Sequence, residues 1–499
     1  MTDHQKEQFA LYGDVLLMDV THRTNKFRVP FCGVAGVDGN GSTVLFAQAL
    51  IRSENQRAFE FVLKNLKRSA PDVVVRTILT DADAAEAAAI REIFPTASHF
   101  RCQWHLTRDV SSFATRLGEE KRAFLRGFAE CQYSTSAEEF YRLWQAFQQR
   151  WSPKGPDVER YLRHLHADHP RWAGYILRHS FTLGMSSTQR IEGLWAKIKT
   201  KLNHTTSLCG MHSAVSRITD DHAKLQGIQA LERPRPPPHT SGRRAEIFQF
   251  FLRDVAATCT TYTHQLIMSD YSIVGQYVVT ELDVERDFMQ MNLLRPQAMG
   301  NSEPTNDLSG ETADLDAANT TTELLQRVQE ASDTMSAFAV VNNLTETTNV
   351  VMVDDKRTTY LCSCLHGVRY GLPCRHVLAV AFQRQWRLTL AVVHPRWFKK
   401  DRRFYVRVEQ PQPYRDMQAV VWDALRELQG QPRPERNTAS QSSDQWLRRH
   451  GRVSRTTVFR QYEEILDVMD EQMGEIYTCA TLEKTLQNMV MQLMVRSSS

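Results

Sequence analysis

The stretch DVLLMDVTHRTNKFRVPFCGVAGVDGNGSTVLFAQALI, residues 14–51, decides the fold. It contains three apolar runs rich in β-forming residues, at 14–20, 29–37 and 42–51. The turn-prone segment DGNG separates the last two runs, so we expect them to pair as a hairpin. The stretch therefore predicts the first three strands of a sheet.

Helical and extended patterns alternate after these strands. Ser53 and Gln56 form a candidate capping box for a helix whose apolar residues recur at helical spacing as far as Leu66. A buried strand is predicted over 73–80, a second helix over about 84–93 and a short strand over 98–102. The order β-β-β-α-β-α-β predicts an α/β unit.

The rest of the chain divides by composition. Residues 106–180 carry aromatic-rich amphipathic segments and are predicted to be helical, and a further helix is expected from near Ser187. Two polar segments, 232–244 and 299–322, have the composition of linkers. The predicted units are 10–225, then 226–334 with linkers and a mixed helical segment, then a small β-containing unit at 335–400, and a helical C-terminal region at 410–499.

Composition narrows the class of protein. With 499 residues the chain exceeds one ordinary core, and 42% hydrophobic with 24% charged residues is normal for a globular protein. The net charge is only +4, so a nucleic-acid surface has to be local. Nine cysteines without a regular framework favour a reducing compartment. We find no signal peptide and no apolar run of the roughly 20 residues that a membrane helix needs, so we expect an intracellular, soluble protein without a membrane partner.

One cysteine cluster has the spacing of a metal site. The segment YLCSCLHGVRYGLPCRHVLAVAF places two close pairs nine residues apart, Cys362 with Cys364 and Cys374 with His376. Three sulfurs and one imidazole match tetrahedral, structural Zn²⁺. His366 is a competing ligand without a paired partner, and the alternative for the whole cluster is a set of reduced core cysteines.

Acidic residues follow two of the predicted strands. Asp19 lies at the end of the first strand and Asp81 directly follows the strand over 73–80. Ligands of open α/β sheets gather at the carboxyl ends of strands, and Glu192 lies beside the apolar stripe of a later helix that can reach the same edge. Three carboxylates there would hold two hard divalent cations, which suits phosphoryl transfer. The alternative is that they are ordinary surface groups.

The cysteine segment resembles the SWIM-type zinc finger, whose pattern is Cys-x-Cys, a variable spacer and Cys-x-His. The GLPCRH run that ends at His376 and the following Ala379 are typical of that finger. The resemblance implies zinc binding and contact with DNA or protein.

Three further stretches resemble the RNase H-like transposase domain of Mutator-like elements (MULE) and the related zinc-finger SWIM-domain-containing proteins. They are LLMDVTHRTNKFRVPFCGVAGVD, LTDADAAEAAAIREIFPTASHFRCQWH and SSTQRIEGLWAKIKTKL. The resemblance implies an RNase H-like domain with an all-helical insertion, followed by the SWIM zinc finger and a helical C-terminal tail. It also implies that Asp19, Asp81 and Glu192 are the catalytic Asp-Asp-Glu set with Mg²⁺ or Mn²⁺, and Asp83 is an alternative for the second position.

Two other features leave their roles open. The same family has a Cys-x-x-His after the second acidic residue, here Cys102 and His105, which either orients the site, touches DNA or is packed in the core. A basic cluster interleaved with aromatic residues follows the zinc segment and is either a nucleic-acid surface or a solvated face. Its basic members are Arg396, Lys399, Lys400, Arg402, Arg403 and Arg407.

Two functions remain open from the sequence. The first is a Mutator-type transposase derivative in the nucleus, which binds zinc and DNA and cleaves or joins strands with a divalent metal. The second is a domesticated, non-enzymatic nuclear adaptor or transcription regulator that uses the SWIM finger for DNA or protein contact. The intact acidic trio favours the first, and the short stretch before the first strand favours the second.

Overall fold

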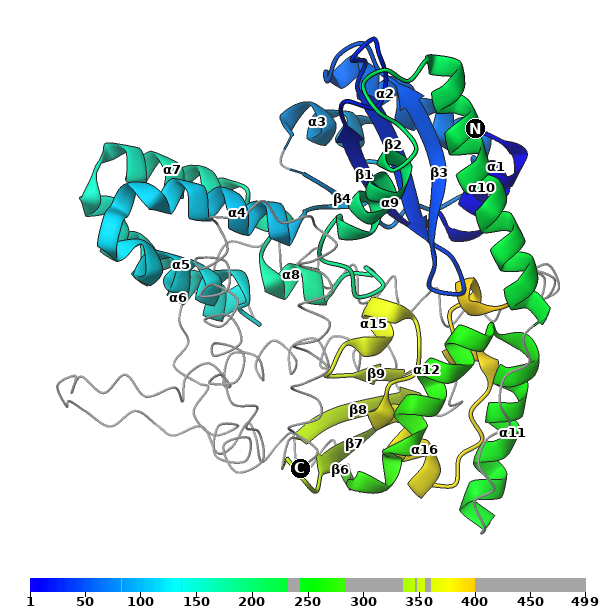
Figure 1. The fold of residues 1–499 in the computed structure, drawn as a ribbon. Helices are drawn as coiled ribbons and strands as arrows, with labels where there is room; N and C mark the ends of the chain where they lie inside the picture. Colours follow the sequence, from blue (N-terminus) through cyan, green and yellow to red (C-terminus); the bar gives the residue numbers. More distant parts are fainter. Residues whose placement is uncertain are drawn as a thin grey trace, which may run out of the picture.

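The computed structural model places two lobes side by side, each built on its own sheet, with a helical arm beside the first (Figure 1). The predicted C-terminal region at 410–499, the linker at 299–322 and most of the linker at 232–244 lie outside the described residues. The structure describes residues 1–81, 83–135, 137–231, 243–282, 335–345, 348–354 and 360–399.

The first sheet has five strands in the order β3-β2-β1-β4-β5. The first three strands pair antiparallel, which confirms the predicted hairpin, and β4 and β5 are added parallel to β1. The element order confirms the predicted β-β-β-α-β-α-β pattern. The strands are β1 (Val15–Thr21), β2 (Phe31–Val37), β3 (Thr43–Leu50), β4 (Thr77–Thr80) and β5 (Ser98–Arg101).

Alternation along β1 assigns one set of residues to each face of this sheet. Leu16 and Met18 pack in one core with α2 (Gln56–Ser69) and α3 (Ala84–Ile93). Val15 and Leu17 pack in the other core, which includes α4 (Gln103–Ala114) and α9 (Gln189–Lys199). Asp19 follows Leu17 in the same alternation, so it lies toward α4 and α9.

Two boundaries differ from the prediction. Helix α2 is capped by Asn55, whose side chain accepts a hydrogen bond from the Ala58 backbone, and not by Ser53, whose hydroxyl accepts one from Asn55. Strand β4 begins at Thr77 and not at residue 73, because the Arg76 and Thr77 backbone amides both donate to the Asp14 carbonyl oxygen instead of extending the ladder. Apolar character alone therefore did not distinguish the segment at 73–76, which precedes the strand, from the paired strand itself.

The helical arm confirms the predicted helical stretch after residue 106. Its tryptophans Trp144, Trp151 and Trp172 are buried in the same core as the inner face of the sheet. An amphipathic arm of this kind can therefore be read from its aromatic spacing. After α4 the arm consists of α5 (Lys121–Gln132), α6 (Ala137–Trp151), α7 (Pro156–Ala167) and α8 (Gly174–Arg178), with short 3₁₀ turns between them.

The second lobe is larger than the predicted unit at 335–400. Its antiparallel sheet has the order β6-β7-β8-β9, and β6 (Tyr277–Leu282) belongs to the segment predicted as mixed and helical. Helices from that segment share a core with the zinc unit. The remaining elements are α11 (Arg243–Thr258), α12 (Thr261–Ser272), β7 (Met335–Asn342), β8 (Thr348–Asp354), β9 (Tyr360–Cys362), α15 (His366–Tyr370) and α16 (Arg375–Gln383), with α10 (Leu208–Leu231) running along the first lobe.

Arg396 ties the two lobes together. Its guanidinium Nε lies 2.9 Å from Asp14 Oδ2, and a second nitrogen donates to the Val37 carbonyl oxygen at 2.7 Å. The Thr260 hydroxyl donates to the Gly39 carbonyl oxygen at 2.6 Å beside it. The side chain of Arg396 is only 1% exposed, so it serves this joint and not a phosphate.

A loop at residues 181–188 is held from both lobes. The Leu183 amide donates to the Arg369 carbonyl oxygen at 2.9 Å, and Tyr370 packs on Gly184, whose φ of +75° suits glycine. On the other side, the Gln103 amide donates to the Ser186 carbonyl oxygen at 2.9 Å. The loop leads directly into α9, so both lobes set where that helix begins.

In the part of the chain that the structure describes, no helix combines the length and the apolar character needed to cross a bilayer.

Candidate metal centres

The register of the first sheet brings Asp19 and Asp81 together. Leu17 of β1 pairs with Leu79 of the parallel strand β4. Asp19 and Asp81 each lie two residues further on, so they are neighbours at one edge and on one face. This is the arrangement that the sequence predicted for adjacent parallel strands.

Asp19 is confined by burial and by a tryptophan. The Trp195 indole nitrogen of α9 donates to Asp19 Oδ2 at 2.6 Å. Burial, aided by the charges of Asp81 and Glu192, raises the pKa of Asp19 to about 7, although the Trp195 hydrogen bond opposes the rise. Asp19 therefore holds its proton more tightly than an exposed aspartate does.

Glu192 approaches the same edge from α9, three residues before Trp195. Thr188, at the N-terminus of the helix, donates its hydroxyl to Glu192 Oε1 at 2.9 Å. That oxygen lies 3.9 Å from His105 Nδ1. One helix thus delivers both the partner of Asp19 and the third carboxylate.

His105 lies between two of the three carboxylates. Its Nδ1 is 2.5 Å from Asp81 Oδ1. Burial by itself would lower the pKa of His105, but its contacts with the Asp81 carboxylate and the Cys102 sulfur raise that pKa to about 10. Asp81, Cys102 and His105 offer three ligand atoms that all lie within 4.8 Å of one another.

Asp83, the alternative to Asp81, has a different task. Its carboxylate accepts hydrogen bonds from the Ala85 and Glu86 amides, at 2.7 and 2.9 Å, and caps α3. This helix cap accounts for Asp83 without a role in the acidic edge.

Glu86 is an acid that the sequence analysis missed. It is 3% exposed, and burial together with the charges of Asp81 and Asp19 raises its pKa to about 8. The sequence carried one sign of this residue, since Glu86 falls on the apolar face of an alanine-rich helix, where an acid is unusual. Its neighbours on α3 pack in the core on the opposite side of the sheet from α9.

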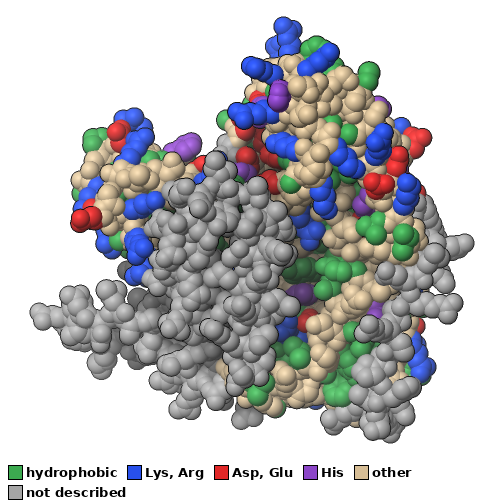
Figure 2. Space-filling view, viewed as in Figure 1, with side chains coloured by type: hydrophobic (Ala, Val, Ile, Leu, Met, Phe, Trp, Pro, Cys, Tyr) green, Lys and Arg blue, Asp and Glu red, His purple; other side chains and the backbone are tan. Residues whose placement is uncertain are grey.

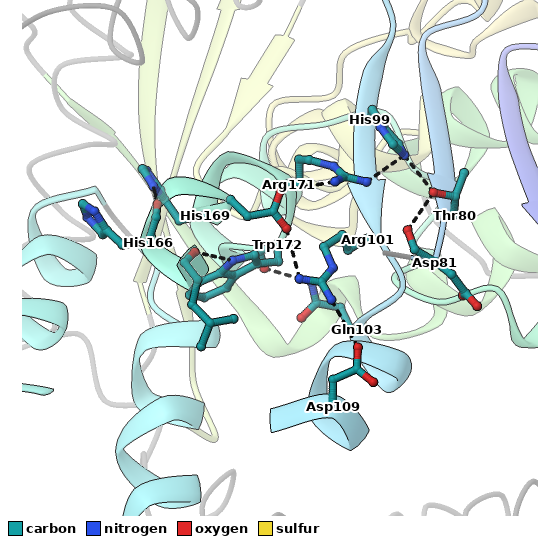
Figure 3. A network of polar contacts seen from close by, with 12 residues as sticks. Thr80, Asp81, His99, Arg101, Gln103, Asp109, His166, His169, Arg171 and Trp172 are labelled. Carbon is teal, nitrogen blue, oxygen red and sulfur yellow. Dashed lines mark hydrogen bonds and ion pairs between the residues drawn. The ribbon is translucent and has the colours of Figure 1, made fainter. Parts of the chain in front are cut away.

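A polar network joins Asp81 to the helical arm (Figure 3). The Thr80 hydroxyl lies 2.9 Å from the Asp81 carbonyl oxygen and 2.8 Å from His99 Nε2, which also faces the Arg171 guanidinium at 3.2 Å. Burial and the charge of Arg171 lower the pKa of His99 to about 3, so the ring is neutral and accepts. Arg171 and Arg101 both pair with Asp168, at 3.2 and 3.0 Å. The strand end that carries Asp81 is therefore fixed by arm residues.

The four predicted zinc ligands converge in the second lobe. One ligand atom from each of Cys362, Cys364, Cys374 and His376 lies within 4.8 Å of the others. Cys362 ends β9, Cys374 caps α16 and His376 lies in its first turn. Hydrogen bonds from Cys362 and Cys374 hold the pKa of Cys364 well below its usual value, while burial raises the pKa of the other two thiols. The donor set of three sulfurs and one imidazole fits tetrahedral zinc.

Asn349 of β8 contacts the far side of His376. Its side-chain nitrogen lies 3.2 Å from His376 Nε2, while Nδ1 of the same ring is 3.5 Å from Cys362 Sγ. Nδ1 thus faces the sulfurs and Nε2 faces Asn349, as expected for a ligand histidine held by an outer partner.

The basic cluster after the zinc segment has another role where the structure describes it. Arg396 is buried in the joint between the lobes, and Lys399 Nζ donates to the Ala256 and Ala257 carbonyl oxygens near the end of α11, both at 3.1 Å. Lys400, Arg402, Arg403 and Arg407 lie outside the described residues.

Exposed lysines and arginines gather instead around the first lobe, with acidic side chains recessed among them (Figure 2). Lys197, Lys199 and Lys201 extend along and beyond α9, and Arg23 and Arg28 lie in the loop after β1. These residues are all exposed, and they lie on or directly after the two elements that supply Asp19 and Glu192.

Family comparisons cover residues of both centres. Residues 15–109 match the MULE transposase domain, which includes Asp19, Asp81, Cys102 and His105 but ends before Glu192. Residues 350–385 match the SWIM zinc finger and include its four ligands. Both matches confirm the family predicted from the sequence.

Curated relatives from Arabidopsis thaliana cover only part of the chain. Protein FAR1-related sequence 5 is 28% identical over 50% of this chain and 33% of its own length. Protein FAR1-related sequence 11 is 27% identical over 43% and 31%, and Protein far-red impaired response 1 is 24% identical over 38% and 23%. The chain thus matches about a third or less of the length of these relatives.

Proposed function

We propose that this chain, which combines a MULE transposase domain with a SWIM zinc finger, is a nuclear, DNA-binding derivative of a Mutator-type transposase that cleaves or transfers DNA strands with divalent metal. One observation carries the proposal. Asp19 on β1, Asp81 after β4 and Glu192 on α9 come from distant parts of the sequence to one edge of one sheet.

The charges at this edge favour a hard cation. Asp19 has a pKa of about 7 because it is buried beside Asp81 and Glu192. Oxygen ligands of this kind fit Mg²⁺ or Mn²⁺, which would supply charge stabilisation and an activated oxygen nucleophile. Trp195 donates a hydrogen bond to Asp19, and Thr188 donates one to Glu192. His105 contacts Asp81.

The topology supports an RNase H-like assignment for residues 10–225, with the helical insertion at about 106–180. A meander of three antiparallel strands is followed by two parallel strands, each after one helix. The acidic residues lie at the carboxyl ends of β1 and β4, where open α/β sheets bind ligands. The zinc finger then forms a separate lobe that meets the edge through the loop at 181–188.

The exposed basic residues give the DNA a path to the acidic edge. Lys197, Lys199 and Lys201 are exposed and have no ion-pair partner among the described residues, so their charges are available to phosphates. Arg23 and Arg28 flank the same edge from the loop after β1. Contacts of this type bind DNA without reading its sequence.

A second candidate is a non-enzymatic nuclear adaptor or transcription regulator, in which the SWIM finger contacts DNA or protein. One matched relative is named for an impaired far-red response and not for a reaction on DNA. Under this alternative, the acidic edge keeps its architecture without turning over a substrate.

A nicking assay separates the two candidates. The purified chain is incubated with supercoiled plasmid and Mg²⁺ or Mn²⁺, and relaxed and linear products are measured on gels. We expect metal-dependent nicking that Asp19→Asn, Asp81→Asn and Glu192→Gln each abolish, and that the cap variant Asp83→Asn retains. DNA binding without nicking by the wild-type chain in either metal would reject the enzyme and leave the adaptor.

A further inference from the structure

The acidic edge also contains a sulfur and an imidazole. Cys102 directly follows β5 as the N-cap residue of α4, and His105 lies in the first turn of that helix. Their ligand atoms and a carboxylate oxygen of Asp81 all lie within 4.8 Å of one another. A hard cation such as Mg²⁺ prefers oxygen alone, whereas a cysteine with a histidine and a carboxylate suits Zn²⁺.

Two of these atoms have no hydrogen bond. Asp81 Oδ1 and His105 Nδ1 are buried atoms without a hydrogen-bond partner among the described residues, although they lie only 2.5 Å apart. Their contact lacks the alignment that a hydrogen bond requires. Two ligands of a tetrahedral Zn²⁺ ion lie about 3.3 Å apart, so a small outward rotation of either side chain would let both atoms bind one cation. Buried polar atoms are otherwise nearly always satisfied.

The sulfur is prepared in the way that a ligand thiolate needs. The Thr188 backbone amide donates to Cys102 Sγ at 3.4 Å. The same residue uses its hydroxyl to hold Glu192 Oε1, which lies 3.9 Å from His105 Nδ1. Groups that contact the ligands of a metal orient those ligands and tune their basicity.

We propose that Asp81, Cys102 and His105 bind a second Zn²⁺ ion, whose fourth position faces Glu192. The SWIM site in the same chain closes its zinc with four protein ligands, which is the structural pattern. Three protein ligands with one open position are the pattern of a zinc site that binds water or substrate. A phosphate oxygen of DNA is the ligand class that fits this position.

This inference deepens the proposed function, because Asp81 belongs to both. One oxygen of Asp81 faces His105, and its second oxygen is left for the Mg²⁺ or Mn²⁺ ion shared with Asp19. The two ideas can nevertheless fail separately, since zinc content is measured without DNA and nicking is measured with added Mg²⁺ or Mn²⁺.

Zinc content tests the site directly. The purified chain is saturated with Zn²⁺, freed of excess by gel filtration, and analysed by mass spectrometry for zinc per chain. We expect two ions in the wild-type chain and one in each of Asp81→Asn, Cys102→Ser and His105→Asn. Cys374→Ser, which breaks the SWIM site, should also retain one. Cys131→Ser is the matched control, because it removes another fully buried cysteine and should leave two ions.

A spectroscopic measurement identifies the ligand. Co²⁺ added to the Cys374→Ser chain should give a thiolate-to-cobalt charge-transfer band, and the band should vanish when Cys102→Ser is added. Circular dichroism confirms that each variant is folded. If Cys102→Ser does not fold, the zinc content of Asp81→Asn tests the site instead, because the Asp81 side chain is 38% exposed and its replacement disturbs the core less. One zinc ion in the wild-type chain, lost in Cys374→Ser, would overturn the proposal. So would two ions that survive Asp81→Asn.

Discussion

Trp195 can donate its 2.6 Å hydrogen bond to Asp19 because the residue paired with Asp19 across the sheet is Gly33. A Cβ on Gly33 would lie 2.2 Å from the indole ring, closer than any real contact. The tight fit of ring, glycine and carboxylate links the packing of α9 to the charge of the acidic edge.

Gly33→Ala should therefore displace Trp195. We expect a loss of about 1–3 kcal/mol of stability from overpacking, together with a weaker rise in melting temperature on addition of Mg²⁺. Thermal unfolding with and without Mg²⁺ measures both. Gly193→Ala in α9 is the control, because its Cβ meets nothing within 4 Å. An unchanged Mg²⁺ response in Gly33→Ala would show that the indole does not position Asp19.

Asp19→Asn should stabilise the metal-free protein above neutral pH. The folded-state pKa of about 7 exceeds the ordinary value of 3.8, so the folded state holds the proton more tightly than the unfolded state. Wild-type stability should then fall as pH rises from about 4 to 7, by at most about 4 kcal/mol, since one pKa unit corresponds to about 1.4 kcal/mol.

The free energy of unfolding in urea at pH 4.5 and pH 8, without Mg²⁺, tests this expectation. The variant should approach wild-type stability at the lower pH and exceed it at the higher one. Asp83→Asn, which keeps the cap of α3, should follow the wild-type curve. Equal stability of Asp19→Asn and wild type at pH 8 would show that ionised Asp19 does not destabilise the folded protein.

Asn349→Ala should weaken zinc binding at the SWIM site by about 10–100-fold, the usual effect of losing an outer partner of a ligand histidine. When Nδ1 binds zinc, Nε2 carries the proton and needs an acceptor, which the Asn349 amide offers in its flipped orientation. Competition with a chelator in the Cys102→Ser chain measures this site alone. Asn349→Asp should retain affinity, and exposed Asn343→Ala is the control. Wild-type affinity in Asn349→Ala would mean that Asn349 only packs there.

Lys197, Lys199 and Lys201 should contribute to DNA binding through counterion release. Replacing all three with Gln should reduce the salt slope of binding by about one for each phosphate that is no longer neutralised. Fluorescence anisotropy with duplex DNA over a range of KCl concentrations gives the slope. Lys154, Arg160 and Arg163 in the arm are the control set, because each already pairs with an acid. A slope equal to that of wild type would place the DNA elsewhere.

Arg396→Met should destabilise the joint between the lobes. It would leave Asp14 in a largely buried position without its partner, and breaking a buried pair costs about 3–5 kcal/mol. Urea unfolding measures the decrease in stability. The exposed pair of Arg160 and Asp157 gives the contrast, because Arg160→Met should cost less than about 1 kcal/mol. A small effect at Arg396 would show that the lobes are held by other contacts.

Features encoded by local pattern were predicted well. Alternation and turn residues located β1 to β3, and ligand spacing within fifteen residues located the SWIM cluster. The contact between His105 and Asp81 could not be read this way, because it depends on how the arm packs against the sheet.

Arg396 was misassigned for a related reason. A run of basic residues does not reveal that one of them is buried against Asp14, 382 positions away. Likewise β6 was not recognised, because its partner β7 follows only after residue 334 and short extended segments have no strong pattern of their own.

The loop at 181–188 has a consequence for biosynthesis. It holds Leu183 and Gly184 in left-handed backbone conformations, with φ of 56° and 75°, and is braced there by Arg369 and Tyr370. A ribosome makes Glu192 well before it makes Arg369, so a nascent chain holds all three acids before the brace exists. Completion of the acidic edge should therefore wait for the zinc finger to emerge and fold around its metal. A cell short of zinc would then accumulate chains whose acidic edge is unfinished.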